Sequence, residues 1–412
     1  MNQKVLNNII LFFLFLIISS VTYAQNDSTS KKNYPFIETE YMVGKIIPNY
    51  LNKFPTTSLH QTLSLNIGTF KTSNLNAWAK YYNFPQTGVN INYSNLGNNK
   101  IFGHEISVLA FISFNVFNTV SKPYYLKIGI GAAYFTTHFD SISNPKNVAI
   151  GSPLAWSFKA GAYKTIAEKN GLNLKLGLVF LHGSNGHTQL PNFGVNSALI
   201  SLSSQFYNKD LKQYQLKKNK PPKKNKLNQY GFGINYGLGV HEYGDKDGPI
   251  GGAKKGVHSL SVFAEKTDNN HFKWGIGLTY RYYPVYAFQI ENRQLTDYLE
   301  NKNLSASNVT LFTKAELLMS HVSINMELGV NLYKPFYQQF ETDFPLGNDA
   351  SSFAKINSTL TRIISTRLGL NLYLFNTNKL PKHNLFIGPY IKANFSQADF
   401  SELAAGYVYN FN

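Results

Sequence analysis

The 412-residue sequence has no cysteine, few charged residues and, beyond its first two dozen residues, no long apolar run. Without cysteine there is no disulfide framework, so the fold must hold itself together. Charged residues make up 15% and hydrophobic residues 43% of the chain, which argues against disorder. A membrane helix needs roughly 20 apolar residues. If the mature chain spans a membrane, it must therefore do so as a closed barrel of strands.

The apolar run at the start of the chain has the features of an export signal. Lys4 precedes an apolar stretch from Ile9 to Ile18, and the small residue Ala24 ends a cleavage-site pattern. We expect residues 1–24 to be a signal peptide that is cleaved on export.

Acidic residues are also scarce. The chain has 22 of them against 39 lysines and arginines, a net charge of +17, which attracts anionic surfaces. In an exported β-rich chain, a phosphorylated lipid is a better partner than nucleic acid, which we do not expect as a partner. Lysine-rich loops that merely keep the protein soluble are the alternative reading of the same charge.

Strand-like segments follow one another in the first half of the chain, most near the ten or so residues that a transmembrane strand requires. Aromatic residues make up 15% of the chain, consistent with the aromatic girdles of an outer-membrane barrel. The eight expected strands are Phe36–Ile46, Ser58–Gly68, Gly88–Tyr93, Gly103–Phe117, Tyr124–Tyr134, Leu154–Tyr163, Leu172–His182 and Val195–Tyr207.

The second half resembles a repeat of the first. We expect a first barrel unit over 25–208, a basic linker over 209–229 and a degenerate second unit over 230–412. The fold class is thus an all-β, antiparallel transmembrane barrel with a duplicated eight-strand unit, as one large barrel or two small ones. In the alignment of the halves, Asn394 takes the position of His182, so the second copy cannot supply the same base.

The hairpin over residues 172–206 carries polar residues on its apolar face. Side chains alternate between the two faces of a strand. His182 and Ser184 continue the leucine-rich even face of the first strand, and Asn196 lies on the matching face of the second. Counting strands back from the C-terminus puts the linker in the periplasm and the loop between these two strands on the outer side.

Histidine and serine two residues apart on one strand face can perform nucleophilic catalysis. Histidine is the usual base that activates a serine hydroxyl near neutral pH. Asn196 can orient the imidazole from the partner strand, as the third group of a triad does. The turn that contains Asn185, Gly186 and Asn192 offers N–H groups and amides for a tetrahedral oxyanion.

The same hairpin resembles the lipid A 3-O-deacylase (acyloxyacyl hydrolase) family of outer-membrane enzymes, over about residues 35–208. The resemblance rests on His-Gly-Ser-Asn-Gly at 182–186 and Leu-Pro-Asn-Phe-Gly-Val-Asn at 190–196. It implies an eight-stranded barrel whose site faces the membrane near the outer leaflet, with Ser184 as nucleophile and His182 as base. The family's acidic triad member falls at Asn196, so either the amide suffices or another carboxylate substitutes.

These features predict an outer-membrane serine esterase that removes an ester-linked acyl chain from lipid A or a related lipopolysaccharide lipid. The alternative is a non-catalytic barrel that serves as a pore, a structural protein or a binding protein. The remaining histidines lack metal-ligand spacing, and we expect neither a metal nor a cofactor. The sequence does not determine the oligomeric state.

Overall fold

The computed structural model describes residues 34–48, 54–71, 77–117, 121–208, 228–245, 252–346, 351–395 and 397–411. The expected signal peptide lies outside the described residues, as do residues 209–227 of the expected linker. The last two residues expected in the linker already belong to a strand, which begins at Asn228.

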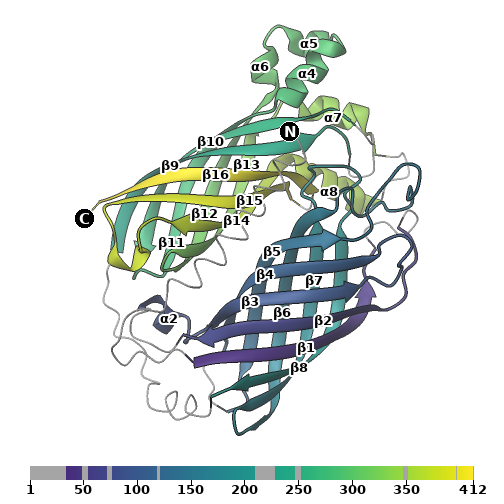
Figure 1. Ribbon diagram of the computed structural model, residues 1–412. Coiled ribbons are helices and arrows are strands. Elements are labelled where there is room, and N and C mark those ends of the chain that lie inside the picture. Colours follow the sequence, from purple (N-terminus) through teal and green to yellow (C-terminus); the bar gives the residue numbers. More distant parts are fainter. Residues whose placement is uncertain are drawn as a thin grey trace.

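Sixteen antiparallel strands form two closed barrels of eight strands each (Figure 1). Barrel 1 comprises β1 (Tyr34–Ile46), β2 (His60–Phe70), β3 (Gln86–Asn95), β4 (His104–Asn115), β5 (Tyr124–Phe135), β6 (Leu154–Lys169), β7 (Leu172–Ser184) and β8 (Val195–Tyr207). Barrel 2 comprises β9 (Asn228–Glu242), β10 (Lys254–Asp268), β11 (Phe272–Tyr282), β12 (Ser307–Met319), β13 (Val322–Tyr333), β14 (Ile364–Tyr373), β15 (His383–Asn394) and β16 (Gln397–Phe411).

The pairing of the end strands decides between the two expected architectures. β8 pairs with β1, and β16 pairs with β9, so each half of the chain closes on itself. The predicted outer-membrane-type barrel with a duplicated eight-strand unit is confirmed, in the form of two small barrels.

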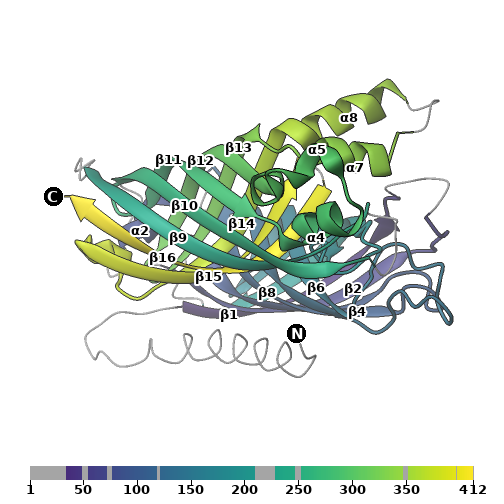
Figure 2. The same cartoon turned by 90° about the horizontal axis from the view of Figure 1, so that it is seen from above.

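Most of the helices that the structure describes belong to barrel 2 and stand at one end of it (Figures 1 and 2). They lie in the connections from β11 to β12 and from β13 to β14, which are the long connections of that barrel. In outer-membrane barrels the long loops face outward and the short turns face the periplasm. The helices of the described residues are α2 (Ala77–Tyr81), α4 (Pro284–Asn292), α5 (Thr296–Leu299), α6 (Lys302–Ser305), α7 (Tyr337–Asp343), α8 (Ser352–Ile363) and the 3₁₀ helix η1 (Thr377–Lys379). None of the helices in the described ranges is long and apolar enough to span a membrane.

Side chains along most of each strand alternate between the lumen and the outer wall. In β7 the even residues point outward, where Leu178 is 68% exposed, and the odd residues are buried. Exposed tyrosines lie close to strand ends. Tyr93 and Tyr134 lie at the end of barrel 1 that carries the β7–β8 loop, and Tyr124 lies at the opposite end. An apolar band with aromatic residues toward its edges is the surface expected against lipid.

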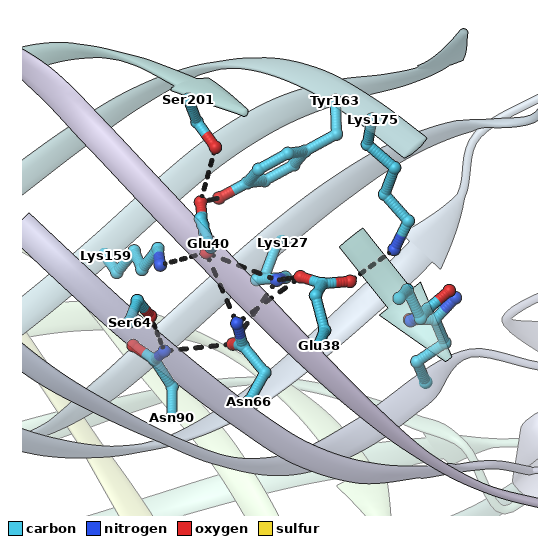
Figure 3. Close-up of polar contacts among 12 residues, drawn as sticks. Glu38, Glu40, Ser64, Asn66, Asn90, Lys127, Lys159, Tyr163, Lys175 and Ser201 are labelled. Carbon is cyan, nitrogen blue, oxygen red and sulfur yellow. Dashed lines mark hydrogen bonds and ion pairs between the residues drawn. The ribbon is translucent and has the colours of Figure 1, made fainter. Parts of the chain in front are cut away.

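Buried ion pairs fill the lumen of each barrel. In barrel 1, Glu38 contacts Lys127 and Lys175 at 2.6 and 2.5 Å, and Glu40 contacts Lys159 at 2.8 Å (Figure 3). An eight-stranded barrel is just wide enough for side chains to fill its interior. The equivalent network in barrel 2 comprises Glu265, Lys273, Lys314, Glu316, Glu327, Arg367 and Glu402.

The barrels contact each other at both ends. At the periplasmic end, Trp78 and Tyr81 of α2 meet the turns of barrel 2. The Trp78 Nε1–H donates to Ser320 Oγ at 3.2 Å, and the Tyr81 ring stacks on His271 with centroids 4.1 Å apart. The contact at the outer end includes the loop between β7 and β8.

Candidate active site at the outer ends of β7 and β8

β7 presents the predicted histidine on the outer wall of barrel 1. His182 follows the exposed Leu178 and Phe180 on the same face and is half-buried at the outer end of the strand. Asn196 is its direct cross-strand partner on β8 and shares that face. The polar pair therefore interrupts an otherwise apolar wall at the level where the strands end.

A short hydrogen bond joins the two residues. His182 Nδ1 lies 2.6 Å from Asn196 Oδ1, and because a carbonyl oxygen only accepts, Nδ1 carries the proton. Phe158, the β6 neighbour of His182, packs against the imidazole with ring centroids 5.8 Å apart. The bond fixes a neutral tautomer in which Nε2 is the nitrogen that can accept a proton.

Ser184 is at the end of the same strand, buried and held by the loop. Its hydroxyl donates to Asn192 Oδ1 at 3.2 Å and accepts the Gly186 N–H at 3.2 Å. Among the described residues no hydrogen bond joins Ser184 to His182. Rotation of the hydroxyl away from Asn192 is needed before it can meet the imidazole, and such bonds are often long in ligand-free sites.

Gly194 keeps open the space between these two residues. A Cβ built on it would lie 3.1 Å from His182 Cε1 and 3.7 Å from Ser184 Cβ, and its φ of +71° favours glycine. The imidazole edge and the serine thus flank the same small gap.

The three residues expected to support the oxyanion, Asn185, Gly186 and Asn192, have different hydrogen-bond partners in the turn. The Asn185 side chain shapes the turn: its Oδ1 accepts from the His187 N–H and its Nδ2 donates to Gln189 O. The Asn192 side chain turns its oxygen, an acceptor, toward Ser184 and toward the Asn185 N–H. The N–H groups of Asn185, His187 and Leu190 are already bonded, because the polar groups of a buried turn satisfy one another. The Gly186 N–H is the donor that points at Ser184.

A second histidine–serine pair shows why the face of the strand matters. His60 Nδ1 lies 2.7 Å from Ser197 Oγ, a closer pairing than that of His182 and Ser184, but both side chains are buried in the lumen. A second His-x-Ser sequence occurs at 321–323, where the Ser323 hydroxyl donates to Glu316 inside barrel 2. Neither serine faces the membrane.

Barrel 2 has no copy of the site at the corresponding position. Asn394 ends β15, the seventh strand of its barrel as β7 is of barrel 1, and its Oδ1 accepts from Lys392 and Lys334 at 2.5 and 3.1 Å. No cluster of three potential metal ligands occurs in the part of the chain that the structure describes.

An apolar hollow of about 710 Å³ lies on the outer wall below the histidine–asparagine pair. Phe180 and Ala198, the outward neighbours of that pair, are among its lining residues, and Ala160 and Ala162 of β6 leave room beside them.

Trp156, Glu242 and Ser401 also belong to the site, and sequence reasoning missed them. Trp156 is the β6 partner of Ser184, and its Nε1–H donates to Ser401 Oγ of barrel 2 at 2.8 Å. Glu242 accepts the Leu190 N–H at 2.5 Å. A strand alignment identifies Trp156 as the neighbour of Ser184, whereas nothing in the sequence indicates the contacts from barrel 2.

A protein-family model matches part of barrel 1. Residues 67–205 match the family model described as lipid A 3-O-deacylase (PagL). The family resemblance is thereby confirmed over about a third of the chain, all of it in barrel 1, and the match includes the whole segment from His182 to Asn196. No curated protein matches the chain.

Solved structures with a similar arrangement are outer-membrane barrels. One is the crystal structure of the outer membrane enzyme PagL, at 19% identity and a TM-score of 0.30, which covers 40% of this chain and 97% of that one. Another is the outer membrane protein opdK from Pseudomonas aeruginosa, at 10% identity and a TM-score of 0.20, covering 92% and 99%. Because these TM-scores are low, the fold is established by the strand pairing of this protein and not by its similarity to these structures.

Proposed function

We propose that this protein is an outer-membrane serine esterase that removes an ester-linked acyl chain from lipid A or a related lipid. The observation that carries the proposal is the His182–Asn196 pair beside Ser184 on the membrane-facing wall, within the segment that matches the deacylase family. His182 and Asn196 are partly exposed on this wall, where a lipid that diffuses laterally in the outer leaflet can reach them, whereas Ser184 is buried beneath the loop.

The chemistry follows the logic of a serine triad. His182 Nε2 takes the Ser184 hydroxyl proton as Oγ attacks the ester carbonyl carbon, and the imidazolium then protonates the departing alkoxide of the lipid. A water molecule, deprotonated by the same nitrogen, attacks the acyl-serine; the imidazolium returns the proton to Ser184 Oγ as the fatty acid is released. Asn196 keeps the imidazole in the required tautomer, although an amide stabilises the imidazolium less than a carboxylate does.

The Gly186 N–H is the oxyanion donor in this scheme. It already points at Ser184 Oγ at 3.2 Å, so a tetrahedral oxygen formed next to Oγ lies within its reach. Asn185 and Asn192 act indirectly, because their side chains give the turn its shape.

The hollow below the pair fits the hydrocarbon part of the substrate. Its lining from Phe180, Ala198, Ala160 and their neighbours is predominantly apolar, and it opens on the lipid-facing wall. The net charge of +17 favours a lipid with phosphorylated head groups. Export through a cleaved signal peptide at residues 1–24 is part of the same proposal.

Expression in a host with 3-O-acylated lipid A tests the proposal. The wild type is expected to lower the lipid A mass by one acyl chain, and Ser184→Ala and His182→Ala to abolish this shift. Ser197→Ala is the matched control, since Ser197 pairs with a histidine inside the lumen and its loss should leave the shift intact. Unchanged lipid A with the correctly folded wild type would instead support the non-catalytic alternative.

The filled lumens argue against a function of the protein as a pore. The buried ion pairs around Glu40 in barrel 1 and around Glu265 in barrel 2 occupy the interior of each barrel. We expect no conductance step in planar bilayers.

A further inference from the structure

The loop that shapes the site is held by both barrels. Within barrel 1, the Phe193 and Gly194 N–H groups donate to Val148 O and Ala149 O at 3.2 and 2.9 Å. The stretch before them, residues 185–192, lies against Gly151 of barrel 1 and also contacts barrel 2. We call the contacts of this stretch and of Trp156 with barrel 2 the inter-barrel clamp.

Glu242 is the central residue of the clamp. Glu242 is 3% exposed, and its carboxylate accepts the Leu190 N–H at 2.5 Å. Its own N–H donates to His187 O at 3.3 Å, so Glu242 holds the loop at two points. Two residues beyond Leu190, the Asn192 amide accepts the hydroxyl proton of Ser184. A shift of Leu190 therefore reaches the serine through Asn192.

Ser401 completes the clamp on the other side of the serine. Its Oγ accepts from Trp156, the cross-strand partner of Ser184, and lies so close to Gly186 that a Cβ there would be 2.2 Å away. Gly186 supplies the N–H that points at Ser184. Barrel 2 thus contacts the residues on both sides of the nucleophile.

We propose that barrel 2, which lacks the site, serves the reaction by positioning it, and that Glu242 and Ser401 are positioning residues for Ser184 and its oxyanion donor. This inference rests on the proposed esterase function. The clamp keeps the Gly186 N–H and Asn192 in place and fixes the Trp156 ring beside the nucleophile, because small displacements of a catalytic group lower the rate strongly.

A matched pair of tryptophan–serine contacts permits a sharp test. Ser401 accepts from Trp156 at the site, and Ser320 accepts from Trp78 at the opposite end of the barrels. Ser401→Ala and Ser320→Ala each remove one inter-barrel acceptor, but only the first touches the clamp. Glu242→Leu removes the acceptor of the Leu190 N–H, and Glu242→Gln retains one.

The full-length protein is assayed on 3-O-acylated lipid A in detergent micelles, and hydrogen–deuterium exchange is followed over residues 185–192. We expect Glu242→Leu to lower kcat at least about tenfold with little change in KM, since it misplaces a transition-state group. Ser401→Ala should lower kcat by a smaller factor, whereas Glu242→Gln and Ser320→Ala should remain close to the wild type. The Leu190 amide should exchange faster in Glu242→Leu only.

Wild-type kcat and exchange in both Glu242→Leu and Ser401→Ala would overturn the inference, as would an equal loss of activity in Ser320→Ala. Failure of the proposed function looks different. In that case the wild type leaves lipid A intact, and only the hydrogen–deuterium exchange tests the clamp. The clamp is refuted if the Leu190 amide is unprotected in the wild type, or if Glu242→Leu does not change its exchange rate.

Discussion

Replacing Asn196 by aspartate tests the role of the third group. The amide oxygen lies 2.6 Å from His182 Nδ1, so a carboxylate there would face the imidazolium that forms during acylation. For unit charges about 4 Å apart at an effective dielectric constant near 20, the attraction is about 4 kcal/mol. Desolvation of the carboxylate in this half-buried position offsets part of it. A net gain of about 2 kcal/mol in the transition state corresponds to a roughly 30-fold faster deacylation.

The assay measures initial rates of acyl loss from lipid A by mass spectrometry, for the wild type, Asn196→Asp and Asn196→Leu. Asn196→Leu should be slower than the wild type, because leucine cannot fix the imidazole tautomer. The folded barrel, followed by its heat-dependent mobility in detergent gels, is the control. If folded Asn196→Asp is no faster than the wild type, the imidazolium does not build up next to residue 196 and the assignment of His182 as base is refuted.

Three further predictions concern the site, the loop and the lumen. Gly194→Ala should reduce deacylation more than tenfold in a folded protein, because its methyl group would fill the gap beside His182 and its φ of +71° adds strain of about 1–2 kcal/mol; wild-type rates would show that the gap is not used. Burial lowers the pKa of His187 from 6.5 to about 3. As the pH drops below about 6.5, the unfolded chain therefore binds a proton that the folded protein does not, and the free energy of unfolding should fall. The melting temperature should therefore decline less between pH 7 and pH 4 in His187→Phe than in the wild type, and parallel declines would contradict this. Glu40→Leu leaves Lys159 buried without its 2.8 Å partner and should lower the free energy of unfolding by about 3–5 kcal/mol, measured by urea unfolding in lipid vesicles; an unchanged midpoint would refute a structural role of the lumen network.

The strands and their faces could be predicted because a barrel wall leaves a simple pattern. Leucines at alternate positions of 172–180 define the lipid face, and strand geometry then puts His182 on that face and Asn196 opposite it. The choice between one barrel and two could not be made, because the same alternating strands fit either closure. It depends on whether β8 pairs with β1 or with β9, which is a long-range choice.

The interior of the β7–β8 loop was beyond prediction for a different reason. Amide side chains such as those of Asn185 and Asn192 can donate or accept, and only the folded turn determines which end faces Ser184. The bond between Trp156 and Ser401 joins residues 245 positions apart, and single serines and tryptophans carry no pairing signal.

The register of β7 against β8 has one more consequence. His182 meets Asn196 because Leu172 meets Phe206 ten residues earlier, with an unbroken ladder between them. A register shift of one residue between β7 and its neighbouring strand would move the imidazole from the lipid-facing wall to the lumen. The ion pairs in the lumen, such as Lys175 of β7 with Glu38 of β1, thereby stabilise the strand register that places the site on the outer wall.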